Sequence, residues 1–183
     1  RPTQDLESNA GRTGYAHDGK PQQGPHLVGD HRPKGRYINQ SGALIATICA
    51  RGGSKVLPRK NVLPFAGLPL IAHSIRQALE CPLIDGVYVS TDDEEIAQVA
   101  REHGARVPYL RPAALATDTA GKLPAIEHLA AHLEAGGTQI GTIVDLQPTS
   151  PLRSAHDLDA ALALRGQADL VVSVTQPSHN PYY

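Results

Sequence analysis

Short apolar runs alternate with amphipathic segments from residue 43 onward, and this alternation constrains the fold more than any other feature of the sequence. Residues 44–49 (LIATIC) form a continuous apolar run rich in β-branched side chains, which is typical of a strand buried on both faces. We expect further strands at 87–89, 106–110, 140–146 and 170–174. Pro108 makes the second of these an edge strand or an irregular one.

Apolar residues at helical spacing predict four helices between these runs. The first contains Ile71 and Ile75, with Pro69 in its first turn. Strands that alternate with helices imply right-handed βαβ units, so we predict an α/β fold with a mostly parallel sheet and helices on both faces. The second helix is marked by a Thr91–Glu94 capping box and a stop at Gly104. The third has one apolar face, made of Ile126, Leu129, Ala130 and Leu133. The fourth is marked by a Ser154–Asp157 cap and a stop at Gly166.

Residues 1–42 differ in composition from the rest of the chain. This stretch is rich in Gly, Pro, Gln and charged residues and shows neither helical nor strand periodicity. Because it has too little apolar surface to offset the entropy of ordering, we predict a disordered tail or linker there. Residues 43–183 are then expected to form one domain with a core of its own.

The overall composition argues against several classes of protein. The chain has 183 residues and a net charge of −1, which does not favour a nucleic-acid-binding surface or a polybasic membrane patch. No apolar stretch approaches the roughly 18 to 20 residues of a membrane-spanning helix. Two cysteines, Cys49 and Cys81, are too few for a disulfide framework, so a reducing cytoplasm is the expected location.

Four polar loops follow apolar runs and are expected to hold the chemistry. In open parallel sheets, ligands bind outside the carboxyl ends of the strands, where such loops gather. The four loops are ARGGSKVLPRKN (50–61), STDDEE (90–95), LRPAALATDTA (110–120) and LQPTSPLR (146–153).

The first of these loops has the composition of a polyphosphate-binding loop. Gly52 and Gly53 allow a tight turn with exposed backbone N–H groups, and Arg51, Lys55 and Lys60 supply positive charge. Neither the Walker pattern G-x-x-x-x-G-K-[ST] nor the dinucleotide fingerprint G-x-G-x-x-G is present. The residues alone therefore indicate a phosphate-binding loop, with a solvated basic turn as the alternative.

The same loop resembles the signature A-R-x-G-S-K-x-x-P-x-K-N of the N-acylneuraminate cytidylyltransferases. VSTDDEEIAQVAREHGA, LRPAALATDTA and LQPTSPLR resemble further segments of that family, in the same order. The related Kdo cytidylyltransferases usually carry P-G-K-P where this chain has residues 58–61 (PRKN), so the neuraminate branch fits better. From residue 43 onward the chain is similar to the amino-terminal two thirds of that family, which implies a three-layer, Rossmann-like nucleotidyltransferase fold that is truncated at its carboxyl end.

The resemblance implies transfer of CMP from CTP to the anomeric hydroxyl of a nine-carbon 2-keto sugar acid, such as sialic acid, with release of pyrophosphate. Catalysis would then rest on positioning and charge neutralisation, assisted by Mg²⁺. It further implies a homodimer for the full-length protein and a role in nucleotide-sugar biosynthesis for lipopolysaccharide or capsule. The particular acceptor acid, and CTP rather than GTP, stay open.

The resemblance also implies roles for individual residues. Lys60 and Arg51 would stabilise charge at the reacting phosphate. Asp145 is a secondary Mg²⁺ candidate, with a hydrogen-bonded structural role as the alternative, and the family's usual Mg²⁺ ligands would lie beyond Tyr183. Arg153 would pair with the sugar carboxylate or brace its own loop. The implied nucleotide-binding set is Arg51, Gly52, Gly53, Ser54, Lys55, Lys60, Asn61, Arg111, Asp118 and Thr119, and the sugar-binding set is Gln147, Thr149, Ser150 and Arg153.

One departure concerns the base pocket, because the family commonly reads D-T-A-S-S where this chain has residues 118–122 (DTAGK). Two alternatives to the leading interpretation stay open. A sugar-1-phosphate nucleotidyltransferase would share the architecture, although the first loop does not match the G-x-G-T-R-L style of that family. A non-catalytic nucleotide-binding or interaction module, left by truncation, is the second alternative.

Overall fold

The computed structural model describes residues 42–174. All of them lie in one of the two compact units of the chain, Gly35–Tyr183. The predicted tail 1–42 falls, apart from Gly42, outside the described residues, so that part of the domain division stays a prediction.

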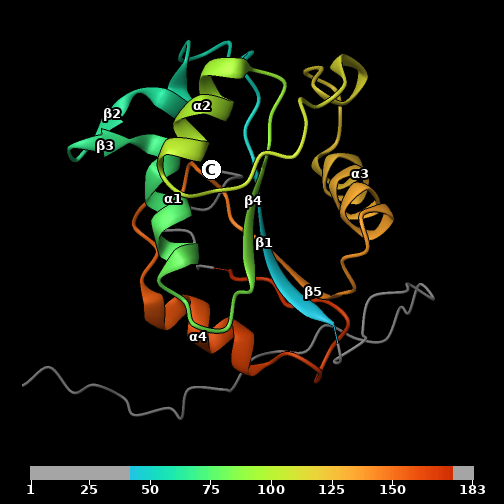
Figure 1. The fold of residues 1–183 in the computed structure, drawn as a ribbon. Coiled ribbons are helices and arrows are strands. Elements are labelled where there is room, and N and C mark those ends of the chain that lie inside the picture. Colours follow the sequence, from blue (N-terminus) through green and yellow to red (C-terminus); the bar gives the residue numbers. More distant parts are fainter. Residues whose placement is uncertain (1–41, 175–183) are drawn as a thin grey trace, which may run out of the picture. The chain divides into compact units, whose positions relative to one another are not determined.

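A parallel sheet of three strands forms the centre of the described fold. The strands are β1 (Ala43–Cys49), β4 (Gly86–Ser90) and β5 (Ile140–Asp145), in the order β4-β1-β5. Both pairings of β1 are parallel, and its last residue, Cys49, pairs with Ser90 at the end of β4. The carboxyl ends of the three strands therefore meet at one edge of the sheet (Figure 1).

Helices cover both faces of this sheet. Alternate side chains of β1 point to opposite sides, and the apolar side chains on each side pack against helices. Leu44, Ala46 and Ile48 pack on one face against α1 (Leu70–Leu79), α2 (Glu94–Glu102) and α4 (Ala155–Ala163). Ile45 lies on the other face with Leu129 and Leu133 of α3 (Lys122–Ala135). Figure 1 shows the same division, with α3 on the side of the strands opposite to α1 and α2. The predicted three-layer α/β arrangement is confirmed.

Short elements complete the chain between β1 and α1 and before α3. They are the 3-10 helices η1 (Lys60–Val62) and η2 (Ala113–Leu115), and an antiparallel hairpin of β2 (Pro64–Phe65) and β3 (Leu68–Pro69). Pro69 ends β3 and is the N-cap of α1, one position before the first turn in which it was expected. The Ser154–Asp157 capping box is present at the start of α4.

The capping box expected from Thr91 and Glu94 is wrong. The N-cap of α2 is Asp93, whose side chain accepts a hydrogen bond from the Ile96 N–H at 3.0 Å. The Thr91 hydroxyl instead accepts from the Asp93 N–H at 3.1 Å. Thr91 still belongs to the sheet edge, where it bridges Leu110, so the helix begins later than the pattern indicated.

Two predicted strands depart from regular structure. Residues 106–110 make two isolated parallel bridges, Tyr88 with Arg106 and Thr91 with Leu110, on either side of Pro108, as expected of an irregular strand. The strand predicted at 170–174 is wrong: those residues form no strand, and Val172 and Val174 are exposed. Apolar β-branched composition indicates a strand only where a neighbouring strand is available to accept its hydrogen bonds.

The fourth helix stops earlier than predicted. α4 ends at Ala163 with Leu164 as its C-cap, and Gly166 lies beyond it with a φ of +84°. Within residues 42–174, no helix has the length and apolar character required to cross a membrane.

The packing of α3 on its own face of the sheet can be tested by truncating a buried side chain of this helix. Leu129 is fully buried in the small cluster beneath α3, so we expect Leu129→Ala to lower the free energy of unfolding by about 2–5 kcal/mol. Leu123→Ala on the same helix is the matched control, because Leu123 is 63% exposed and should change stability by less than about 0.5 kcal/mol. Urea denaturation measures both, and equal costs would contradict the assignment of this core.

Candidate active site at the carboxyl edge of the sheet

A pocket of about 360 Å³ lies at the carboxyl edge of the sheet. Its walls come from the ends of β1 and β5, from η1 and from the loop that precedes α3. Seven of the predicted site residues line it: Arg51, Lys60, Asn61, Arg111, Asp118, Gln147 and Thr149. Three of the four loops singled out in the sequence therefore converge on this pocket, as the geometry of a parallel sheet requires, whereas residues 90–95 contribute no lining residue.

The chain after β1 is held at both ends of its first turn. The buried Asn61 donates from Nδ2 to the Arg51 carbonyl at 3.1 Å, which ties the start of η1 to the end of β1. The Gly52 N–H donates to Asp92 Oδ1 at 3.1 Å, so the loop after β4 holds the loop after β1. These two contacts place Arg51 and Lys60 on the same pocket.

The two glycines of this loop differ in what they require. A Cβ at Gly52 would lie 2.6 Å from Asp93 Oδ2, so the close approach of α2 demands glycine, whereas a Cβ at Gly53 would meet open space. The Gly52 N–H is bound to Asp92, and the Ser54 N–H donates to the Gly52 carbonyl at 2.9 Å. The Gly52 amide is therefore already occupied in this structure, whereas the exposure of the Gly53 amide to an anion stays a prediction.

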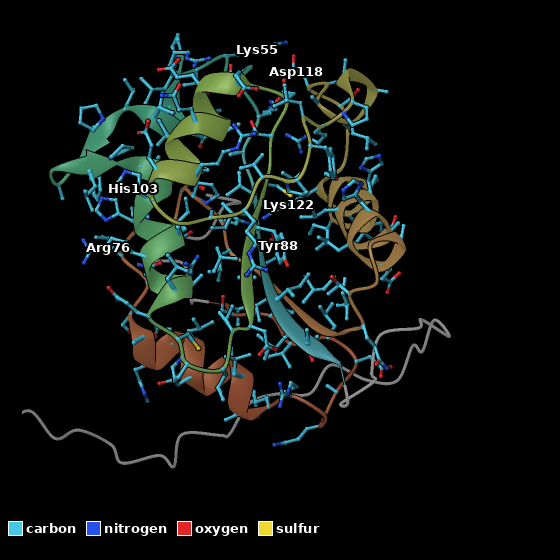
Figure 2. All side chains as sticks on the ribbon, in the orientation of Figure 1. Lys55, Arg76, Tyr88, His103, Asp118 and Lys122 are labelled. Carbon is cyan, nitrogen blue, oxygen red and sulfur yellow. The ribbon has the colours of Figure 1, made fainter. Side chains whose placement is uncertain are left out.

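Two of those cations meet one carboxylate at the rim of the pocket. Arg51 Nη1 lies 2.9 Å from Asp118 Oδ1 and donates to the Thr117 carbonyl at 2.8 Å, and Lys55 forms an ion pair with the same carboxylate. Figure 2 shows Lys55 and Asp118 together at the upper end of the fold. The Lys55 ammonium, followed by the Arg51 guanidinium, lowers the pKa of Asp118 from its ordinary value.

Arg111 places a buried positive charge on the pocket wall. Its side chain is only 6% exposed, its Nη2 lies 3.7 Å from Asp92 Oδ1, and its backbone N–H donates to the Thr91 carbonyl at 2.7 Å. The Arg111 Nε has no hydrogen-bond partner among the described residues.

Lys122 and Asp145 form an ion pair between the first residue of α3 and the last residue of β5. Lys122 also lines the pocket, and Thr47 Oγ1 lies 3.4 Å from Asp145 Oδ1. Cys49 lines the pocket beside them, and burial, followed by the negative charge of Asp145, raises the pKa of its thiol. Asp145 is thus paired in this structure, as expected of the hydrogen-bonded structural role that was the alternative to metal binding.

The described residues do not fit a metal site of their own. No group of three or more His, Cys, Asp or Glu side chains that could hold a metal ion occurs in residues 42–174. Asp145, the one candidate ligand from the sequence, is paired with the Lys122 ammonium. A divalent ion at that carboxylate would have to displace the ammonium.

The loop after β5 is held against α1. Ser74 Oγ donates to the Gln147 carbonyl at 3.1 Å, and Gln77 Nε2 donates to the carbonyls of Pro151 and Arg153 at 2.8 Å each. The Arg153 guanidinium donates back to Gln77 Oε1 at 2.8 Å. Arg153 therefore braces this loop and lies outside the pocket, while Gln147 lines it.

The structure thus divides the predicted site residues into two groups. Seven residues line the pocket, and the others do not. Lys55 does not line the pocket but forms an ion pair with Asp118, which does. The residues outside the lining are Gly52, Gly53, Ser54, Lys55, Thr119, Asp145, Ser150 and Arg153.

Several lining residues had no predicted role in binding. They are Cys49, Leu115, Thr117, Ala120, Gly121, Lys122 and Pro148. Gly121 and Lys122 belong to the segment DTAGK, where the sequence departs from the family pattern, and the others lie in or beside the predicted loops.

Comparison with known proteins identifies the family. A family profile described as Cytidylyltransferase matches residues 45–179. The chain belongs to the cytidylyltransferase family. It is 40% identical over 139 residues to a CMP-N,N'-diacetyllegionaminic acid synthase of Legionella pneumophila, covering 75% of this chain and 60% of that protein. It is 35% identical over 134 residues to a pseudaminic acid cytidylyltransferase of Campylobacter jejuni, covering 72% of this chain and 58% of that protein.

A further relative agrees with this assignment, and a solved structure shares the fold. An N-acylneuraminate cytidylyltransferase A of Danio rerio is 37% identical over 151 residues, which are 81% of this chain and 32% of that protein. A CMP:2-keto-3-deoxy-manno-octonic acid synthetase complexed with CTP shares the fold with a TM-score of 0.56 at 23% identity, over 67% of this chain and 47% of that chain. The cytidylyltransferase spans less than two thirds of the length of the relatives that it matches.

The ion pairs at the rim predict an unusually acidic Asp118. We expect its carboxyl to titrate below the ordinary aspartate pKa of about 3.9, because Lys55 and Arg51 favour the charged form. The ion pairs of Asp118 should therefore persist as the pH falls to about 3.9, the ordinary aspartate pKa. They should break only as the pH passes through the lowered pKa of Asp118. Carboxyl ¹³C chemical shifts recorded against pH measure this midpoint.

Lys55→Ala should raise the pKa of Asp118 toward the ordinary value, and Arg165→Ala, an exposed residue outside the pocket, should leave it unchanged. A wild-type midpoint at or above about 3.9 that does not respond to Lys55→Ala would contradict the rim geometry.

Proposed function

We propose that this cytidylyltransferase transfers CMP from CTP to the anomeric hydroxyl of a nine-carbon 2-keto sugar acid and releases pyrophosphate. One observation carries the proposal: four cationic side chains line a single pocket at the carboxyl edge of the sheet, in a chain of this family. They are Arg51, Lys60, Arg111 and Lys122. A triphosphate with its negative charge distributed along its length fits such a lining.

The proposed reaction is an in-line displacement at the α-phosphorus of CTP. The sugar's anomeric oxygen forms a new bond to that phosphorus, the bond between the α-phosphorus and the bridging oxygen breaks, and pyrophosphate leaves while the hydroxyl proton is released. The chain forms no covalent intermediate in this step. Arg51 and Lys60 would stabilise the charge that develops on the phosphate oxygens, which is the largest contribution that a preorganised site makes.

The remaining lining residues divide between nucleotide and acceptor. Arg111, whose guanidinium is on the pocket wall, would donate to an acceptor on the nucleotide, and Asn61 would contact the ribose or the base. Gln147 and Thr149, on the loop that α1 holds in place, would contact the acceptor sugar. The relatives named for legionaminic, pseudaminic and N-acylneuraminic acids support a nine-carbon acid as the acceptor class.

The surroundings of the reaction are part of the same proposal. Mg²⁺ would enter with the triphosphate, whose oxygens and bound waters supply most of its ligands. A cytoplasmic location is supported by the two free thiols, Cys49 and Cys81. The product would serve nucleotide-sugar biosynthesis for lipopolysaccharide or capsule, and the homodimer of the full-length protein stays a prediction.

Lys60→Ala should lower the rate of pyrophosphate release from CTP, with sialic acid and Mg²⁺ present, by about 100- to 1,000-fold in kcat/KM. The physical reason is the loss of a preorganised cation that faces the reacting phosphate. A coupled pyrophosphate assay measures the rate. Arg165→Ala is the matched control, since it removes a cation of similar size outside the pocket and should leave the rate unchanged.

The same assay separates the alternatives. Release with a sugar-1-phosphate in place of a sugar acid would indicate a sugar-1-phosphate nucleotidyltransferase. CTP binding without release under any of these conditions would indicate a non-catalytic nucleotide-binding module. Full activity in Lys60→Ala would contradict the role given to this residue.

A further inference from the structure

The turn that carries Lys60 contains an unusual backbone conformation. Arg59, the N-cap of η1, has a φ of +59° and a ψ of +19°, which is the left-handed region. Only glycine, and to a smaller extent Asn and Asp, adopts this region readily, and arginine there needs compensating contacts. Backbone strain of this kind gathers at functional sites, where the surrounding structure imposes it.

Those compensating contacts come from the start of α2. The Arg59 guanidinium pairs with both carboxylates that flank the first residue of that helix, Asp93 and Glu95. Asp93 is itself fixed as the N-cap of α2, where Oδ1 accepts from the Ile96 N–H at 3.0 Å. Because the planar guanidinium binds the fixed carboxylate of Asp93 and also pairs with the exposed Glu95, the side chain, and hence its Cα, has little freedom.

The clamp acts on the residue that follows it. Lys60 begins η1 directly after Arg59, its N–H donates to the Leu57 carbonyl at 3.2 Å, and its side chain lines the pocket. The Val62 N–H donates to the Arg59 carbonyl at 2.9 Å, so the turn is closed around Arg59 on both sides. The direction in which Lys60 enters the pocket therefore depends on the dihedral angles of Arg59.

We propose that Arg59 is a positioning residue for Lys60: its ion pairs with Asp93 and Glu95 hold the left-handed turn that directs the Lys60 ammonium into the pocket. The expected effect on the reaction rate rests on the proposed function. The expected effect on the backbone turn rests on the geometry alone. Arg59 itself does not line the pocket. It acts through Lys60 and not on the substrate.

The test uses Arg59→Gly, because glycine adopts a φ of +59° freely and so keeps the turn accessible while the clamp is lost. We expect kcat for pyrophosphate release to fall by about 10- to 100-fold, as for other small misplacements of a catalytic group, with KM for CTP changed less than about 3-fold. The melting temperature should stay equal or rise. Arg59→Lys, which keeps one charged donor, should recover part of kcat.

Arg101→Ala is the matched control, because Arg101 Nη1 pairs with Glu94 Oε1 at 3.0 Å on the same helix but outside the pocket. It should leave kcat and KM at wild-type values. Unchanged kcat in Arg59→Gly would overturn the proposal. If the melting temperature fell at the same time, the ion pairs of Arg59 would have a structural role only.

Amide hydrogen exchange decides the matter independently of turnover. In Arg59→Gly, exchange at the amides of Lys60, Val62 and Leu63 should accelerate while exchange within α2 beyond its first turn stays at the wild-type rate. If the wild-type chain releases no pyrophosphate but these amides do accelerate, the proposed function fails and the positioning of the turn stands. Unchanged exchange at these amides would overturn the positioning even in an active enzyme.

Discussion

The site depends on the way in which the acidic start of α2 holds the cationic loop after β1. Asp92 accepts from the Gly52 N–H and lies beside the buried Arg111, so a single carboxylate joins the loops that follow β1 and β4. Asp93 caps α2, pairs with Arg59 and approaches Gly52 so closely that any side chain there would have to displace its carboxylate. Each of these carboxylates pairs with a positive group. Their negative charge therefore offsets the repulsion between the cations that gather at this edge of the sheet.

The layered fold could be predicted from the sequence because its signal is periodic. Continuous apolar runs marked β1, β4 and β5, and helical spacing marked the four helices that cover the two faces. The errors fell where the outcome depends on a neighbour and not on local pattern. Residues 170–174 have the composition of a strand but no strand partner among the described residues, and Thr91 has the residue type of a cap but belongs to a bridge with Leu110.

The site could be predicted in part, for a similar reason. Parallel strands bring loops distant in sequence to one edge, so the motifs identified Arg51, Lys60, Arg111 and Gln147 correctly as neighbours on one pocket. Which groups already satisfy one another could not be predicted, because that depends on tertiary contacts. The Gly52 amide turned out to be occupied, Asp145 turned out to be paired with Lys122, and Arg153 turned out to brace its own loop. Nothing in the sequence marked Arg59 as a residue with a left-handed backbone.

A crystal structure of this chain grown with CTP and Mg²⁺ would test the central claim most directly. We expect the triphosphate at the carboxyl edge of the sheet, against Arg51 and Lys60, with an acceptor atom of the nucleotide within hydrogen-bonding reach of the Arg111 guanidinium. It would be contradicted by a nucleotide bound elsewhere, for example in the smaller hollow between His73 and Arg153, with the pocket at the strand ends left empty.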